Sequence, residues 1–154
     1  MSYRNCILIS CIFSLLLLLV ACNNKKESVQ ATSESATIEF IKNTWFTKQY
    51  EKSLHVSSSN ITKDQLKKES DKVPHDYWEI HKKIIVKYRQ ITTNKQDKKA
   101  NYEVFLPDYR KIINLKLQKN NNKWLVTDFS SKDFEADETD TLNKYEWNST
   151  ELKK

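Results

Sequence analysis

The sequence predicts an α+β domain in which N-terminal helices pack on a four-stranded antiparallel meander sheet. Three observations support this prediction: apolar residues at helical spacing between residues 36 and 50, a helix-capping pattern at 62–65, and two-residue alternation after residue 80. Apolar residues recur about every 3.6 positions on a buried helix face and every second position on a strand face. Helices followed by a run of strands indicate α+β rather than a parallel α/β sheet.

The first predicted helix covers about four turns and begins near Ser33 or Ser35, because serine is a favourable N-cap residue. Its apolar residues form one stripe, made by Ile38, Ile41 and Trp45 and widened by Phe40, Phe46 and Tyr50.

A second helix is predicted to start at Thr62. Thr62 and Gln65 have the spacing of a capping box, and Ile61 with Leu66 has the spacing of a hydrophobic staple. The helix should run to about Asp71 and stop at Val73-Pro74, because a proline disfavours helical geometry in the preceding residue.

Four segments then alternate between apolar and polar residues, which is typical of antiparallel strands with one buried face. They cover residues 80–92, 100–107, 110–118 and 123–129. The chain contains no glycine, so asparagine, which tolerates positive φ better than most residues, is expected in tight turns. The sequence KNNNK at 119–123 is the predicted site of one such turn.

The N-terminal residues have the layout of a secretory signal, with Arg4 followed by an apolar run from Ile7 to Val20. This run would span only about 21 Å, whereas the hydrocarbon layer of a bilayer is about 30 Å thick. The sequence LVAC at 19–22 resembles the lipobox of bacterial lipoproteins. The resemblance implies diacylglycerol on the Cys22 thiol and cleavage between Ala21 and Cys22. The alternative is an uncleaved helix with a buried cysteine.

The predicted organisation is a signal peptide at 1–21, a flexible tether at 22–34, an α+β domain at 35–131 and an acidic tail at 132–154. All three cysteines lie within the first 22 residues, so the mature chain would form no internal disulfide. The net charge is +6, with an acidic excess after residue 131. The tail is expected either to dock through Phe134, Tyr145 and Trp147 or to be disordered.

The sequence ATIEFIKNTWFTKQYEKSLHVSS, at 36–58, resembles the opening helices of the nuclear-transport-factor-like superfamily, also called SnoaL-like or cystatin-like. The sequence LQKNNNKWLVTDF, at 117–129, is similar to the closing hairpin of small lipoproteins in that superfamily. The resemblance implies a curved, cone-like sheet closed by the first helix. The chain departs from the pattern by lacking the usual hairpin glycine and by adding the acidic tail.

Some members of that superfamily are enzymes with an aspartate base and a tyrosine donor inside the cone. The resemblance makes Asp128, Tyr88 and Tyr102 the candidate catalytic residues, all expected to face inward. The competing interpretation makes both tyrosines core aromatics and gives Asp128 a structural role. The spacing of the three histidines indicates no metal site, and no cofactor is expected.

The predicted function is a lipid-anchored, non-enzymatic binding or accessory protein on the extracytoplasmic face of a bacterial cell membrane. Its partners would be the membrane, through Cys22, and an envelope protein or an anionic wall polymer. Nucleic acid is not expected as a partner of an exported chain. The sequence does not define the oligomeric state, and a dimer is one alternative. The alternative is a small-molecule binder or isomerase-like enzyme that uses the cone interior.

Overall fold

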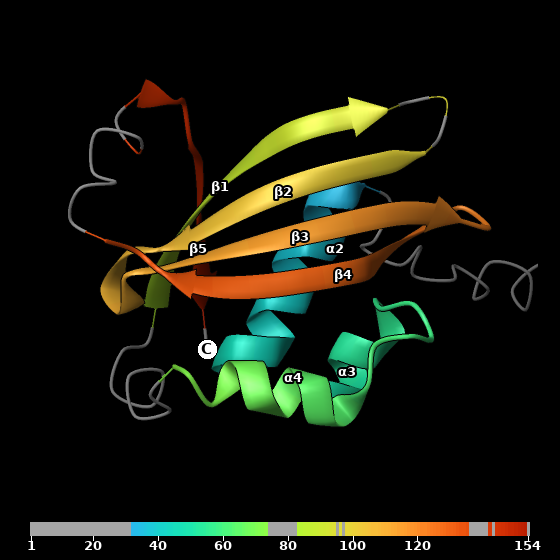
Figure 1. The fold of residues 1–154 in the computed structure, drawn as a ribbon, viewed down its shortest axis with the longest axis horizontal. Coiled ribbons are helices and arrows are strands. Elements are labelled where there is room, and N and C mark those ends of the chain that lie inside the picture. The colour runs from blue at the N-terminus through green and yellow to red at the C-terminus, as the bar shows by residue number, and fades with distance from the viewer. Residues whose placement is uncertain are drawn as a thin grey trace, which may run out of the picture.

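The computed structural model describes residues 32–73, 83–94, 96, 98–135, 142 and 144–153. The helical elements are α2 (Ser33–Ile41), the π-helical segment η1 (Lys42–Phe46), α3 (Tyr50–His55), α4 (Lys63–Ser70) and the short 3-10 helix η2 (Pro107–Tyr109). The strands are β1 (Lys83–Asn94), β2 (Lys99–Leu106), β3 (Lys111–Asn120), β4 (Lys123–Asp133) and β5 (Asn148–Lys153). The α+β class is confirmed (Figure 1).

The first helix begins with a capping box that was not predicted. Thr32 is the N-cap, and its hydroxyl accepts a hydrogen bond from the backbone N–H of Ser35 at 3.0 Å. After Ile41 the helix widens into η1, where Thr47 donates to the carbonyl of Lys42, five residues earlier, at 2.9 Å. The predicted four-turn helix is therefore an α-helix followed by a wider turn, and the separate helix α3 was not predicted.

The second predicted helix is confirmed at its start. Thr62 caps α4, and the side chain of Gln65 accepts a hydrogen bond from the Thr62 N–H at 2.8 Å. Ile61 and Leu66 are both buried, with 6% and 0% of their surfaces exposed. This cap fixes the direction in which α4 leaves the loop that follows α3.

In the part of the chain that the structure describes, the sheet has five strands rather than the predicted four, and all neighbours pair antiparallel in the order β4-β3-β2-β1-β5. The additional strand, β5, pairs with β1 from Lys83 opposite Lys153 to Tyr88 opposite Asn148. It was missed because its sequence, NSTELK, has only one buried apolar residue, Leu152. The edge strand β5 therefore lies within the segment expected to form an acidic tail.

The tight turn between β3 and β4 is confirmed, with Asn121 and Asn122 at φ of 45° and 67°. Three more of the described residues have positive φ, namely Lys48, Lys98 and Arg110. The expectation that asparagine would occupy the tight turns is wrong at these positions. Each left-handed residue with a side chain costs roughly 1–2 kcal/mol, and the chain has no glycine with which to avoid it.

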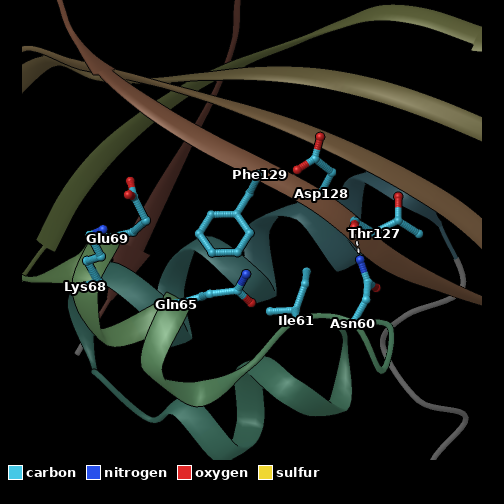
Figure 2. A pocket seen from close by; sticks show the side chains of 8 residues that line it. All are labelled: Asn60, Ile61, Gln65, Lys68, Glu69, Thr127, Asp128 and Phe129. Atoms are coloured by element: carbon cyan, nitrogen blue, oxygen red, sulfur yellow. Dashed lines mark hydrogen bonds between the residues drawn. The ribbon is translucent and has the colours of Figure 1, made fainter.

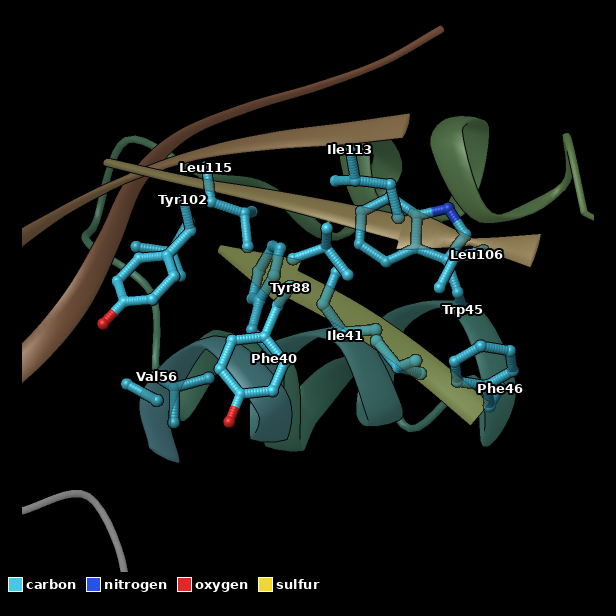
Figure 3. Packing of buried hydrophobic residues seen from close by; sticks show 14 of the residues in the cluster. Phe40, Ile41, Trp45, Phe46, Val56, Tyr88, Tyr102, Leu106, Ile113 and Leu115 are labelled. Carbon is cyan, nitrogen blue, oxygen red and sulfur yellow. The ribbon is translucent and has the colours of Figure 1, made fainter. Parts of the chain in front are cut away.

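The hydrophobic core lies between the inner face of the sheet and the continuous helix formed by α2 and η1 (Figures 1 and 3). Its largest fully buried side chains include Trp45, Phe40 and Phe46 from the helix and Leu106, Ile113 and Leu115 from the sheet. The outer face carries a smaller aromatic contact, in which Phe105 packs against Phe134 and Trp147, with ring centroids 5.1 and 6.3 Å apart.

Candidate functional site

The predicted site residues do not form one site. Tyr88 and Tyr102 face the interior, on β1 and β2, whereas Asp128 lies on the outer face of β4. Ala21 and Cys22, the predicted processing and lipidation residues, lie outside the described residues.

The two tyrosines contact the first turn of α2. The Tyr88 hydroxyl donates a hydrogen bond to the Glu34 carboxylate, and the Ser33 and Tyr102 hydroxyls lie 2.9 Å apart. Both phenol side chains are buried, with Tyr88 7% exposed and Tyr102 3% exposed. We refer to Ser33, Glu34, Tyr88 and Tyr102 as the tyrosine cluster; both tyrosines are labelled in Figure 3.

Burial is the main cause of the raised pKa values of the two tyrosines in the tyrosine cluster. Burial, with a smaller effect of the nearby Glu34 carboxylate, raises the pKa of Tyr88 to about 12. Burial also raises the pKa of Tyr102, while the hydrogen bond with Ser33 opposes the shift. Both phenols are therefore neutral at physiological pH, and their hydroxyls are engaged in contacts that hold α2 against the sheet. The contacts support the interpretation of these residues as core aromatics.

Asp128 faces outward because of a β-bulge in β4. Strict alternation from Trp124 and Val126 would have placed Asp128 on the inner face. The pairing instead moves from Val126 opposite Leu117 to Asp128 opposite Lys116, so that Thr127 is an additional residue. The expectation of an inward Asp128 is therefore wrong.

The bulge changes which side chains reach the core and which meet solvent. Phe129 takes the inward place, with its ring centroid 5.4 Å from that of Phe40. Asp128 accepts a hydrogen bond from the Lys116 ammonium at 2.8 Å, and both side chains are well exposed. An exposed pair of this kind contributes little to stability.

A shallow groove of about 240 Å³ lies between α4 and β4 (Figure 2). Its lining residues are Asn60, Ile61, Gln65, Lys68, Glu69, Thr127, Asp128 and Phe129. Asn60 bridges the two sides by donating to the Thr127 carbonyl at 3.0 Å. Sequence reasoning missed this groove because its two sides are more than fifty residues apart in the chain, and only the α4 cap had a local signal.

The acidic side chain in this groove is already engaged. Glu69 accepts hydrogen bonds from Lys72 at 2.6 Å and from Ser131 at 2.5 Å. Burial raises the pKa of Glu69, but the hydrogen bonds from Lys72 and Ser131 outweigh it, so the pKa is lowered. The carboxylate is thus held ionised between α4 and β4, which suits a structural contact better than proton transfer.

Among the described residues there is no group of three or more histidine, cysteine, aspartate or glutamate side chains placed to bind a metal ion. In the same part of the chain, no helix has both the length and the apolar character needed to cross a bilayer. Comparison of the chain with protein-family models, curated proteins and solved structures found no match.

Proposed function

We propose that the chain is a lipid-anchored protein of the bacterial cell envelope, held on the extracytoplasmic face of the membrane by acylated Cys22. The single observation that carries this proposal is the LVAC sequence at 19–22, placed directly after the apolar run Ile7–Val20. A single acyl chain gives only marginal membrane binding, whereas a diacylglycerol makes attachment stable. The anchor would therefore need no membrane-spanning helix.

The proposed role of the domain is binding rather than catalysis. It is supported by the engagement of the Tyr88 and Tyr102 hydroxyls by Glu34 and Ser33. It is also supported by the position of Asp128, which cannot act as a base toward a ligand in the interior while it lies on the outer face. The partner would be an envelope protein or an anionic wall polymer. The isomerase-like alternative has no observation that favours it over this role.

The cone-like, nuclear-transport-factor-like fold remains our hypothesis for the domain. Support comes from α2 and η1 packing on one face of an antiparallel sheet, with Phe40, Trp45 and Phe129 in mutual edge contacts across that interface. A cone filled in this way should not take up an apolar dye such as anilinonaphthalene sulfonate. Strong dye binding by the native chain would instead indicate an open interior and favour the small-molecule alternative.

The anchor is tested by fractionation of cells that produce the chain with Cys22 or with Cys22→Ser. We expect the Cys22 chain to remain with membranes after washing at high salt and to be released by detergent. The Cys22→Ser chain should no longer be converted to the acylated form that stays with washed membranes, and it should keep its signal sequence. Equal fractionation of the two chains would overturn the proposal.

A further inference from the structure

Two hairpin connections lie side by side at one end of the sheet. One joins β1 to β2 between Asn94 and Lys99, and the other joins β3 to β4 between Asn120 and Lys123. The backbone N–H of Lys119 donates to the carbonyl of Lys98 at 2.8 Å, which ties the two connections together. Both ends appear at the right of Figure 1. The sheet therefore presents one joint surface formed by two hairpins.

This surface carries four lysines, which we call the hairpin-end lysines: Lys98, Lys99, Lys119 and Lys123. Three are exposed and Lys119 is half-buried. None of the four has an ion-pair partner among the described residues. By contrast, seven lysines elsewhere lie 2.5 to 3.6 Å from a carboxylate: Lys48, Lys63, Lys72, Lys83, Lys111, Lys116 and Lys153. The positive charge of the hairpin ends is therefore not neutralised within the described structure.

The other described residues of the two connections are neutral amides. Asn94, Gln96 and the run from Asn120 to Asn122 are all exposed. Lys95 and Asp97 lie outside the described residues, and their formal charges cancel. Asp128, the carboxylate that follows on β4, is bound by Lys116. Within the described residues, the surface thus combines ammonium groups that have no ion-pair partner with hydrogen-bonding amides, a composition suited to phosphate groups.

The same end of the domain is the end that the lipid anchor would reach. α2 starts there, because Ser33 contacts Tyr102, three residues along β2 from Lys99, or about 10 Å. Thr32 follows Cys22 by ten positions, and a chain of this length spans at most about 35 Å. β1, with twelve residues, is about 40 Å long, so η2 at the opposite end of the sheet lies much farther from the anchor.

We propose that the hairpin-end lysines dock on anionic phospholipid headgroups, so that the domain stands on the membrane with this end down. The location of the contact rests on the proposed lipid anchor, but the electrostatic contact itself needs no lipid on Cys22. The anchor would raise the local concentration of the surface at the bilayer. Docking would leave α4 and η2 away from the bilayer, where a partner in the cell envelope could reach them.

The test uses the chain from residue 22 onward with Cys22→Ser, which carries no acyl group. Its hydrophobic core, among the described residues, lies between Ala36 and Leu152, so this chain retains the folded domain. The probes are phosphatidylcholine vesicles with and without phosphatidylglycerol, and the readout is co-sedimentation. We expect binding only to the anionic vesicles, with an affinity that falls as salt is added.

A variant with glutamine at all four hairpin-end lysines is compared with a charge-matched control. The control carries Lys42→Gln, Lys67→Gln, Lys68→Gln and Lys144→Gln, which change η1, α4 and the segment before β5. Each docked lysine contributes roughly fivefold to partition at an anionic surface, so the hairpin-end variant should lose about a hundredfold or more. The control should bind within about threefold of the parent chain, because its lysines lie away from the bilayer.

Equal losses in the two variants would show a response to net charge alone and would overturn the proposed surface. Binding to a soluble anionic wall polymer but not to phosphatidylglycerol vesicles would also overturn it. Thermal unfolding of each variant checks that the substitutions leave the fold intact. The vesicle experiment and the acylation of Cys22 test different proposals. If Cys22 is acylated in cells but the chain does not bind anionic vesicles, only the docking surface is refuted. If the chain binds anionic vesicles but Cys22 is not acylated in cells, only the anchor is refuted.

Discussion

The hydroxyl of Tyr88 donates a hydrogen bond to the carboxylate of Glu34, 54 residues earlier in the chain. The contact joins β1, in the interior of the sheet, to the first turn of α2. The neighbouring contact between Ser33 and Tyr102 does the same for β2. The start of the domain is therefore fixed to the sheet at two points, directly after the segment that would lead from the membrane anchor.

Replacement of Tyr88 with phenylalanine should lower the free energy of unfolding by about 1–2 kcal/mol, since it removes a hydrogen bond to a charged acceptor while keeping the buried ring. Urea denaturation measures the change. Tyr145→Phe is the matched control, because Tyr145 is 44% exposed and its hydroxyl makes no hydrogen bond to the described residues. An equal effect of the two substitutions would mean that the Glu34 contact is not formed in solution.

Stability should also depend on alkaline pH through Tyr88. Its pKa is raised to about 12 by burial and by Glu34, whereas a tyrosine in the unfolded chain ionises near 10. The native state therefore favours the neutral phenol, and the resulting stability is complete below about pH 10 and is lost as the pH rises toward 12. The difference in unfolding free energy between the parent chain and Tyr88→Phe should shrink over this range. A constant difference would contradict the shifted pKa.

The turn between β3 and β4 allows a matched pair of substitutions at Asn122, whose φ is 67°. Asn122→Ala should destabilise the chain by about 1 kcal/mol, because alanine has a Cβ atom but lacks the short polar side chain that lets asparagine adopt the left-handed region. Asn122→Gly should be neutral or stabilising by a few tenths of a kcal/mol, since glycine adopts this region freely but loses more entropy on folding. Thermal denaturation measures both, and the reverse order would contradict the observed turn.

Removal of residues 148–154 should destabilise the sheet and promote self-association. The truncation takes away β5, exposes the hydrogen-bonding edge of β1 and removes the buried Leu152 side chain, which contributes about 2 kcal/mol. Leu152→Ala in the intact chain is the control, because it loses the side chain but keeps the strand pairing. Size-exclusion chromatography should show larger species for the truncated chain only. Identical profiles for the truncated, substituted and parent chains would contradict this account of β5.

Much of the fold could be predicted because its signals are local. The Thr62 cap depends on Gln65, three residues away, and the turn at Asn121 and Asn122 follows from the absence of glycine. The alternation of β1 to β3 reflects one buried face of each strand. In these segments, short-range preference and tertiary packing agree, so the sequence pattern is sufficient.

The remainder depends on contacts between distant residues. The π-helical turn at η1 and the bulge at Thr127 each shift the phase of a regular pattern, and no local residue type marks either one. β5 exists because β1 offers an open edge, not because NSTELK has strand-like alternation. The candidate site was affected most, because a single bulge was enough to turn Asp128 from the expected interior to the surface.

The central claim is that Cys22 carries the membrane anchor, and mass spectrometry of the N-terminal peptide tests it most directly. The peptide should be taken from the chain extracted from membranes with detergent. We expect it to begin at Cys22 and to carry a diacylglycerol mass on the sulfur. A peptide that begins elsewhere, or one that begins at Cys22 with a free thiol, would contradict the account.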